Sequence, residues 1–479
     1  MKIRLDINNK AHLQRIKYVV GDYVMSNLAW LTYNIVRFQM GHAVGNYYIL
    51  KNYLLSDIVL LGQLVFPLLM MVTYIFSGYY NNVCRKSRVQ ELLTTLASSG
   101  INTLMIFFLA LINDVIGVRG TDYEMIFILW GLLFGFVYLV RAIITNIASN
   151  QIKSRKWTFP TLIIGSGSAA LNFANKLNSR RKSSGYEIKG FVNIPGENPV
   201  KGNPLPCYEL DELKEVCDRE GIWELIVVPS RDDTTQTMNA INHLFAVGLP
   251  IMISPEYFNK MQTPVSISDI YGEPLVNISR SSMSDSGKNL KRAIDVVVSL
   301  IALIVLTPLY AIVSIIIKAT SPGPVFYLQE RVGLHNKPFN IIKFRSMVQD
   351  AEATGKPQLT SDNDPRITPF GRFMRKYRID ELPQFWNVLK GEMSIVGPRP
   401  ERQYYVDQII ERVPAYALLH QVRPGITSMG MVKFGYAQNI DEMVERVTFD
   451  LMYLNNLSLL NDIKILLYTV KIVFTRRGM

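Results

Sequence analysis

Two adjacent carboxylates, Asp380 and Glu381, are the residues whose type and spacing best suit chemistry in this sequence. The apolar residues behind them recur at helical spacing, and these are Leu382, Phe385, Trp386 and Leu389. Pro383 fits only the first turn of such a helix. We therefore expect both carboxylates at the helix N-terminus, where backbone N–H groups and the helix dipole favour anions. A pair in that place can bind a divalent cation and present a nucleophile, whereas the alternative is that Asp380 merely caps the helix.

Basic residues in the same part of the chain are candidates for binding phosphate groups. Two strand-like runs, Val325–Gln329 and Phe339–Lys343, are joined by a turn around Gly333. Lys343 ends the second run and Arg345 follows two residues later, so both side chains are expected to point the same way, toward phosphate oxygens. Guanidinium groups match the geometry of phosphate, and the further candidates of this kind are Arg378, Arg399, Arg331 and Arg366.

An uncharged run from Val296 to Ile317 is long enough to cross a membrane. Basic residues stand on both sides of it, namely Lys288, Lys291 and Arg292 before it and Lys318, Arg331, Lys337 and Lys343 after it. Because positive flanks favour the cytoplasm, a single crossing cannot satisfy both. Thr307-Pro308 lies in the middle, and a proline there can bend the helix. We interpret the run as a re-entrant helix-break-helix hairpin; the alternative is a fifth, kinked spanning helix.

Four apolar stretches in the first 150 residues each approach the length of about 20 residues that crosses a bilayer, namely Ile16–Phe38, Leu54–Phe76, Leu92–Ile116 and Met125–Ile147. Lysines and arginines concentrate before the first stretch, after the second and after the fourth, which predicts that both ends of this bundle are cytoplasmic. Asp22 and Arg141 are expected near those cytoplasmic ends, where they reach water. The alternative for these charges is an ion or proton path.

The middle of the chain has a βαβ pattern with a parallel sheet. Its strand-like runs are Thr161–Ile164, Ile188–Asn193, Leu225–Val228 and Pro250–Ile253. The first run leads into a glycine-rich turn at Gly165 and Gly167, which can seat a pyrophosphate on a helix N-terminus. Ala170 takes the last glycine position, and Asn193 stands where a ribose-binding acid is expected. The alternative is that these glycines only make a tight turn and allow close packing.

The composition agrees with a membrane protein. Hydrophobic residues make up 49% of the 479, and the net charge is +12. Such a charge suits nucleic acid, an anionic membrane or phosphorylated substrates, and the membrane explains it with the fewest assumptions. The three cysteines, Cys84, Cys207 and Cys217, have no metal-type spacing and are expected to be reduced. The polar, basic start does not resemble a cleaved signal peptide.

Long collinear motifs link the carboxylates to the basic residues, and they are Lys343–Met347, Asp364–Thr368, Asp380–Gln384, Asn387–Gly391, Ser394–Pro400 and Arg423–Thr427. Together they resemble the bacterial polyprenyl-phosphate hexose-1-phosphate transferases, the large monotopic phosphoglycosyl transferases that initiate exopolysaccharide, capsule or O-antigen synthesis. The resemblance implies a membrane protein with a four-helix transmembrane bundle at 1–150, a Rossmann-like α/β domain at 151–280 and an α/β monotopic catalytic domain at 288–479. It also implies a re-entrant helix at about 290–319, broken at a small-residue–proline pair that Thr307-Pro308 matches.

The same resemblance implies a reaction. A hexose 1-phosphate would pass from a UDP-sugar, with UDP-glucose or UDP-galactose favoured, to undecaprenyl phosphate, releasing UMP and forming a lipid diphosphate sugar. Asp380 would attack the phosphorus that bears the sugar and form a covalent intermediate in a ping-pong mechanism. Glu381, with Asp380, would hold Mg²⁺. Past Thr427 the run Ser428–Val432 departs from the pattern of many members, which leaves the nucleotide and sugar preference open.

The implied location is the bacterial cytoplasmic (inner) membrane, with the catalytic domain on the cytoplasmic face. The expected partners are the UDP-sugar, undecaprenyl phosphate, the lipid bilayer, a second copy of the chain and later glycosyltransferases of the same pathway, but not nucleic acid. A membrane-bound nucleotide-sugar dehydratase or epimerase is an alternative. It would need a Tyr-x-x-x-Lys pair, which residues 157–290 lack, and it leaves Asp380-Glu381 without a role. The other alternative is a non-catalytic polysaccharide-assembly protein whose basic domain only binds lipid.

Overall fold

The computed structural model describes residues 2–41, 47–111, 122–179, 183–195, 197, 205–229, 240–241, 243–244, 247–253, 275–278, 283–349, 351, 364–435 and 437–474. The chain forms two compact units. The first contains Met1–Phe159, Arg180–Tyr186 and Ser284–Asn289, and the second contains Pro160–Ser179, Glu187–Met283 and Leu290–Met479.

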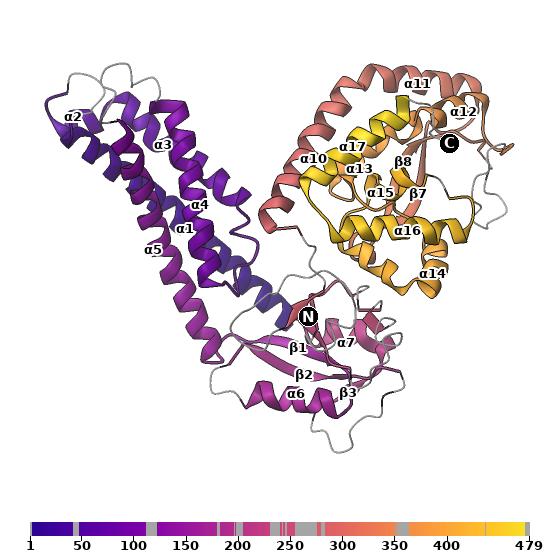
Figure 1. Ribbon diagram of the computed structural model, residues 1–479, viewed down its shortest axis with the longest axis horizontal. Coiled ribbons are helices and arrows are strands. Elements are labelled where there is room, and N and C mark those ends of the chain that lie inside the picture. Colours follow the sequence, from indigo (N-terminus) through magenta and orange to yellow (C-terminus); the bar gives the residue numbers. More distant parts are fainter. Residues whose placement is uncertain are drawn as a thin grey trace. The chain divides into compact units, whose positions relative to one another are not determined.

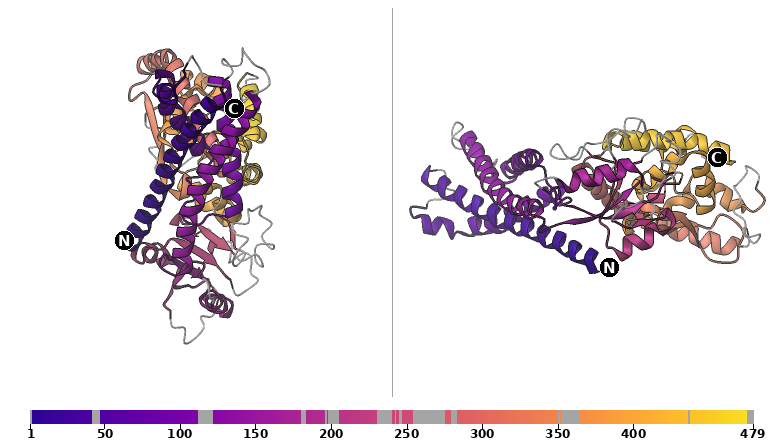
Figure 2. Two further views of the ribbon diagram at one scale, coloured as in Figure 1. Left: turned by 90° about the vertical axis from the view of Figure 1, so that its left-hand side faces the viewer. Right: turned by 90° about the horizontal axis from the view of Figure 1, so that it is seen from below.

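Long helices make up most of the first unit (Figure 1). They are α1 (Lys2–Gln39), α2 (Leu50–Leu54), α3 (Asp57–Phe76), α4 (Arg88–Ile106), the π-helical turn Phe107–Leu111 and α5 (Asp122–Lys153). Helix α1 packs against α5 and α3, and α4 packs against α5; the views in Figures 1 and 2 show α1 and α5 side by side. Their shared core is rich in aromatic and large aliphatic side chains, among them Trp30, Tyr33, Met70, Leu129 and Leu133.

Three helices in the described part of the chain are long and apolar enough to cross a membrane, namely Asp57–Phe76, Arg88–Leu109 and Glu124–Lys153. They coincide with the second, third and fourth apolar stretches of the sequence, although the end of the third stretch lies outside the described residues. Helix α1, which contains the first stretch, is not among the three. The membrane character of the protein therefore rests on α3, α4 and α5 and on one bent helix pair that is described below.

The expectation that Asp22 and Arg141 reach water is wrong, because both side chains are completely buried. The Arg141 guanidinium donates to the Asp22 carboxylate at 2.7 Å and to the Thr95 hydroxyl at 2.9 Å. The Tyr80 hydroxyl donates to the same carboxylate at 2.6 Å. A buried ion pair is tolerated when further hydrogen bonds satisfy its remaining atoms. Hydroxyl groups from α4 and from the segment after α3 satisfy the remaining atoms of this ion pair inside the bundle. The hydropathy of each apolar stretch, taken separately, does not reveal such contacts between stretches.

The middle of the chain contains a six-stranded sheet with the order β3-β2-β1-β4-β5-β6. The strands are β1 (Phe159–Ile164), β2 (Tyr186–Val192), β3 (Cys207–Tyr208), β4 (Glu224–Val227), β5 (Ile251–Ile253) and β6 (Val276–Asn277). The pairs β1–β4, β2–β3 and β4–β5 are parallel, and β5–β6 is antiparallel. Helices α6 (Ser168–Asn178) and α7 (Leu213–Arg219) connect strands. The predicted parallel α/β sheet is confirmed, and its four predicted strands correspond to β1, β2, β4 and β5.

The last part of the chain begins with two helices, α10 (Asp285–Val305) and α11 (Thr307–Thr320), which meet at a bend of 59°. Pro308 lies in the first turn of α11, a position that tolerates a proline because its missing N–H has no helical partner there. Helix α10 must end before Pro308, because the proline ring would clash with the preceding helical turn. This bent pair is apolar enough to be a membrane segment when taken together.

The remaining elements form an α/β body around short strands. Strands β7 (Phe326–Val332) and β8 (Pro338–Phe344) pair antiparallel, whereas β9 (Ser394–Val396) and β10 (Gly425–Thr427) pair parallel. The helices of this body are α12 (Pro369–Lys376), the 3-10 segment η4 (Ile379–Gln384), α13 (Phe385–Lys390), α14 (Gln403–Arg412), the 3-10 segment η5 (Pro414–Gln421), α15 (Met429–Lys433), α16 (Ile440–Asn455) and α17 (Leu459–Phe474). The sequence motifs fall on β8, η4, α13, β9 and β10 and on the segment that directly precedes α12.

Candidate active site

Asp380 and Glu381 lie in the first turn of the 3-10 segment η4, ahead of α13. Arg378, in the left-handed conformation with φ 56°, separates this turn from α12. The apolar face predicted from Leu382 onward is the less buried side of this segment, and Trp386 on that side has 51% of its surface exposed. The predicted helix N-terminus is thus a 3-10 turn, and both carboxylates are buried in it.

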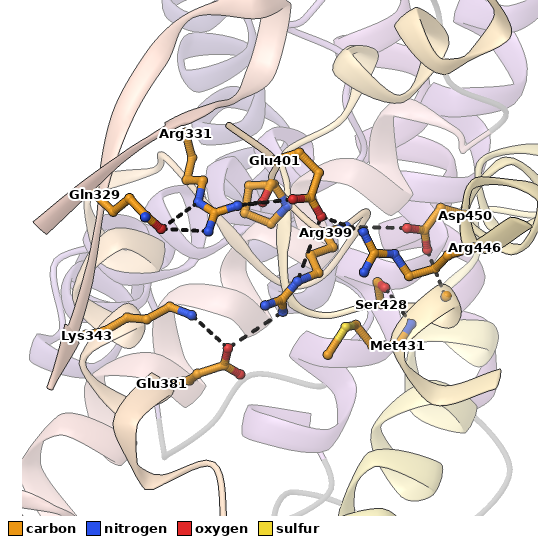
Figure 3. Close-up of polar contacts among 12 residues, drawn as sticks. Gln329, Arg331, Lys343, Glu381, Arg399, Glu401, Ser428, Met431, Arg446 and Asp450 are labelled. Atoms are coloured by element: carbon orange, nitrogen blue, oxygen red, sulfur yellow. Dashed lines mark hydrogen bonds and ion pairs between the residues drawn. The ribbon is translucent and has the colours of Figure 1, made fainter. Parts of the chain in front are cut away.

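Three cations surround the carboxylate of Glu381, and Figure 3 shows two of them, Lys343 and Arg399. Lys343 Nζ lies 3.0 Å from Oε1, and guanidinium nitrogens of Arg378 and Arg399 each lie 3.6 Å from this carboxylate. Burial opposes ionisation, but these three charges outweigh it and hold the pKa of Glu381 well below its ordinary value. The charge of the Glu381 carboxylate is thus stabilised by the three cations that it gathers at one point.

Asp380, the neighbouring residue, is shifted in the opposite direction. Burial raises the pKa of its carboxyl group, and the negative charge of Glu381 raises it further. Cations oppose this shift, and they are Lys343, Arg375 and Arg378. Two adjacent carboxyl groups whose pKa values are pushed apart are suited to different roles. Glu381 is suited to hold the neighbouring cations in place. The reactivity of Asp380 depends on the burial and the charges that shift its pKa.

A second carboxylate, Glu401, gathers three arginines (Figure 3). Arg331 and Arg446 lie 3.1 Å and 2.6 Å from its two oxygens, and Arg399 Nε lies 3.9 Å away. Arg399 thus stands between Glu381 and Glu401 and joins the two groups into one network. Asp450 lies next to Arg399, whose backbone N–H donates to its carboxylate at 3.5 Å, and it also accepts a hydrogen bond from the Gly430 N–H at 2.9 Å.

Not every predicted phosphate ligand joins this network. Arg345 is buried and donates to the carbonyl oxygens of Ser321 and Pro322, both at 2.7 Å. Arg345 therefore fixes the segment that follows α11. It does not point the same way as Lys343, because β8 ends at Phe344 and side chains alternate regularly only within a strand. Arg366 pairs with Asp364 at 2.6 Å. Among the described residues, the structure brings Lys343, Arg378, Arg399 and Arg331 together with Glu381 or Glu401 but does not bring Arg345 and Arg366 to them.

Sequence reasoning missed four residues of this region, which are Arg375, Glu401, Arg446 and Asp450. Arg375 donates to the Ser346 hydroxyl at 2.9 Å and acts electrostatically on Asp380. Glu401 directly follows the quoted motif that ends at Pro400. Arg446 and Asp450 stand four residues apart on α16, a spacing that places two side chains on one helix face. That spacing was readable, but nothing local to α16 indicated that this face is turned toward Arg399.

The bent helix pair is fastened to the same elements that carry the site. On α10, Arg292 donates to the carbonyl oxygens of Val388 and Leu389 at the end of α13, at 2.7 and 3.0 Å. On α11, Val313 and Ile317 share a core with Phe344 and Met374, which directly follow Lys343 and precede Arg375. The Tyr310 hydroxyl donates to the carbonyl of Leu382, next to Glu381, at 3.0 Å. Helix α11 therefore forms part of the support behind the charged residues.

At the glycine-rich turn of the middle sheet, a side chain of the protein itself accepts the backbone hydrogen bond that a phosphate would accept. The Ser166 N–H, which a phosphate would need, donates to the Glu197 carboxylate at 2.9 Å. Gly165 adopts φ +127°, and a side chain there would meet the Val228 carbonyl at 2.2 Å. Among the described residues, this geometry favours the alternative in which the glycines make a tight turn and allow close packing.

The matched family model covers the part of the chain that contains Asp380, Glu381 and the cations around them. The model of the family "Bacterial sugar transferase" matches residues 286–476. An Aeromonas hydrophila UDP-N-acetylgalactosamine-undecaprenyl-phosphate N-acetylgalactosaminephosphotransferase is 44% identical over 40% of this chain and 44% of its own length. An Escherichia coli (strain K12) UDP-glucose:undecaprenyl-phosphate glucose-1-phosphate transferase is 32% identical over 60% of this chain and 61% of its own length.

A third relative matches more of the chain. The Salmonella typhimurium undecaprenyl-phosphate galactose phosphotransferase is 32% identical over 67% of this chain and 69% of its own length. The chain spans less of the first two relatives, at 44% and 61% of their lengths. On the evidence of the family model and of this broad match, the chain belongs to the bacterial sugar transferase family.

Proposed function

We propose that this protein is a membrane enzyme that transfers a hexose 1-phosphate from a UDP-sugar to undecaprenyl phosphate, with release of UMP. The observation that carries the proposal is the buried Asp380-Glu381 pair beside clustered cations. Membership of the bacterial sugar transferase family supports the same reaction, since the named relatives are transferases that act on undecaprenyl phosphate. The product would be the lipid diphosphate sugar that initiates an exopolysaccharide, capsule or O-antigen.

The balance of charge in the site favours a ligand with several negative charges. The site contains more cations than carboxyl groups: Lys343, Arg331, Arg375, Arg378, Arg399 and Arg446 act on Asp380, Glu381, Glu401 and Asp450. An excess of buried positive charge is costly unless an anion compensates it. A diphosphate offers that charge in a form that guanidinium groups bind well. Among the substrates of a sugar transferase, both the nucleotide-sugar and the polyprenyl phosphate meet this requirement.

Asp380 is the proposed nucleophile. One of its carboxylate oxygens bonds to the phosphorus that bears the sugar, while the bond from that phosphorus to the bridging oxygen breaks and UMP leaves with that oxygen. An oxygen of undecaprenyl phosphate then attacks the same phosphorus, and the bond to Asp380 breaks and restores the carboxylate. Phosphoryl transfer depends mostly on positioning and charge neutralisation. Lys343, Arg378 and Arg399, held by Glu381, are suited to supply both.

Mg²⁺ is the proposed cofactor. No group of three or more acidic, cysteine or histidine side chains gathers anywhere in the described ranges, so a cage built of protein ligands is not the arrangement we propose. Mg²⁺ is usually bound by one or two carboxylates together with substrate phosphates and water. Glu381 and Asp380 provide these carboxylates. When bound, the ion would neutralise charge on the diphosphate.

The hairpin formed by α10 and α11 is proposed to enter the membrane and return on the same side. Its exposed apolar side chains include Val297, Ile301, Ile304, Val305, Ile312 and Ile315. Both arms are attached to the catalytic body, since Arg292 and Asp295 of α10 bind α13 and β9 while Ile317 of α11 packs with Phe344. A straight spanning helix would carry its two ends to opposite sides of the bilayer. With the bundle inserted by the positive-inside rule, the body lies on the cytoplasmic face of the bacterial inner membrane.

This topology predicts the labelling of cysteines in intact cells by a membrane-impermeant thiol reagent. After removal of Cys84, Cys207 and Cys217, Lys337→Cys and Lys288→Cys should both stay unlabelled until the membrane is permeabilised, because both flanks of the hairpin face the cytoplasm. Tyr48→Cys is the matched control: Tyr48 is 92% exposed in the connection after α1, and this connection is expected outside, so it should be labelled from outside. Labelling of Lys337→Cys from outside would instead favour a spanning helix.

The experiment that tests the proposed function is UMP release from a panel of UDP-sugars by the purified full-length chain, with undecaprenyl phosphate and Mg²⁺ present. We expect UMP release with one or few of the sugars, with UDP-glucose and UDP-galactose the first to test. A dehydratase or epimerase would change the sugar without releasing UMP, and a non-catalytic assembly protein would leave every UDP-sugar intact. Either result would overturn the proposal. A second copy of the chain and later glycosyltransferases of the same pathway are the proposed protein partners.

A further inference from the structure

Glu401 is a buried carboxylate that the proposed reaction leaves without a role. Its side chain is 5% exposed, and guanidinium groups of Arg331 and Arg446 stand at 3.1 and 2.6 Å from its two oxygens. An acid enclosed by cations in this way cannot reach a substrate, and its negative charge would repel a diphosphate. Any contribution to the reaction must therefore pass through the residues that it holds.

Arg399 is the residue through which Glu401 can act. Its Nε faces Glu401 at 3.9 Å, and its NH1 nitrogen faces Glu381 at 3.6 Å. The guanidinium thus stands between two carboxylates that face different edges of the same planar group (Figure 3). Because the planar group is attracted at both edges, its orientation is restricted as well as its position.

Residues of β7 and α16 also fix the backbone next to Arg399. The Val332 N–H donates to the Glu401 carbonyl at 2.9 Å, and Arg331 donates to the Pro400 carbonyl at 3.1 Å. On the opposite side, Arg446 of α16 binds the Glu401 carboxylate. Pro398 and Pro400, which flank Arg399, further restrict the backbone. Glu401 is thus the common partner of β7, α16 and the Arg399 side chain.

We propose that Glu401 is a positioning residue that orients Arg399 against Glu381 and toward the phosphates of the donor. The proposal rests on the proposed function. It assigns Arg331 and Arg446 to the same support, since each fixes Glu401 from a different element. Without the Glu401 charge, three guanidinium groups would repel one another, and Arg399 would keep only one of its two carboxylates.

The test compares Glu401→Gln, which keeps the shape and removes the charge, with Arg399→Gln and with the double variant. Loss of one preorganised charge contact in an active site lowers turnover by about 100-fold or more, and we expect kcat/KM for UMP release to fall by about that factor in each single variant. If Glu401 acts through Arg399, the double variant should be no slower than Arg399→Gln alone, because the two changes remove one interaction. Losses that multiply would overturn the proposal.

Folding is separated from positioning by two further variants. Glu401→Gln/Arg446→Met removes one charge of each sign and so restores the net charge around this point. The proposal expects it to remain about as slow as Arg399→Gln, whereas recovery of the wild-type rate would show that Glu401 only balances charge. Asp22→Asn breaks a buried ion pair with Arg141 in the helical bundle. It should lower the melting temperature while leaving kcat/KM of the folded enzyme unchanged.

A binding measurement keeps this proposal distinct from the proposed function. Inorganic pyrophosphate is the probe, and its stabilisation of the full-length chain is measured as a shift in melting temperature. We expect the shift in the wild type to be lost to the same degree in Glu401→Gln and in Arg399→Gln. A wild type that shows the shift but releases no UMP would overturn only the proposed function. A shift that survives in Glu401→Gln but not in Arg399→Gln would overturn the positioning role.

Discussion

Asp380→Asn protein is expected to fold normally and to release no UMP above background. Asparagine matches the shape of the buried carboxyl group but lacks the oxygen nucleophile that the proposed reaction requires. Losses from removing a nucleophile reach the order of 10⁶ in kcat in well-studied enzymes. The melting temperature should not fall, because the substitution removes a buried carboxylate that stands next to the like charge of Glu381. UMP release and thermal unfolding of the purified variant, measured side by side with the wild type, check both parts.

The covalent step has its own readout. Wild-type protein given labelled UDP-sugar without lipid acceptor should retain the sugar phosphate and release UMP, whereas the Asn variant should retain none. Mass spectrometry of the peptide that contains Asp380 locates the adduct. Donor and acceptor should give parallel lines in double-reciprocal plots, since UMP leaves before the acceptor reacts. Intersecting lines and an unmodified peptide would mean direct transfer, with Asp380 as a metal ligand or general base.

Arg345→Met is the matched control for this experiment. Arg345 belongs to the same motif as Lys343 but binds the carbonyl groups that follow α11. Its loss should lower stability, because two carbonyl groups lose their partner, and should leave the trapped adduct in the protein that folds. The contrast between the two variants separates a residue of the reaction from a residue of the scaffold.

Local patterns were sufficient for the elements that depend on local physics. The strand-like run Thr161–Ile164 became part of β1, and Thr307-Pro308 marks the place where α10 gives way to α11. In each case the information lies within a few residues, in an apolar run or in the missing N–H of a proline. The same holds for the carboxylate pair, whose adjacency is visible in the sequence itself.

Long-range packing decided the features that sequence reasoning missed. Arg345 and Lys343 look equivalent in sequence, but β8 ends between them, and only Lys343 faces Glu381. Arg446 lies more than forty residues beyond Arg399, and its relevance depends on how α16 packs against the segment that carries Glu401. Asp22 and Arg141 are 119 residues apart and were expected at water-exposed helix ends, yet they pair inside the bundle. None of these pairings has a local signature, because the partner comes from a distant element.

Glu381→Gln is the second substitution for which we expect a large effect, and here both activity and stability should fall. The change removes the charge that gathers Lys343, Arg378 and Arg399. Breaking a buried pair by removal of one partner costs roughly 3–5 kcal/mol, because the other charge stays buried without compensation. The misplaced cations would also lose their alignment with the diphosphate, and we expect kcat/KM to fall by about 100-fold or more. Chemical unfolding and UMP release measure the two effects.

Two comparisons decide what Glu381 does. Lys343→Met/Glu381→Gln removes both members of the closest ion pair, so it should regain much of the lost stability while remaining inactive. Titration with Mg²⁺ tests whether Glu381 holds the metal ion. If it does, high Mg²⁺ should raise the rate of Glu381→Gln, and this variant should still bind pyrophosphate through Arg399 as the wild type does. If Glu381 instead orders the cations, the rate should not respond to Mg²⁺, and pyrophosphate binding should fall. A variant that keeps wild-type activity at low Mg²⁺ would contradict both roles, because the three cations would then hold their positions without the carboxylate that they surround.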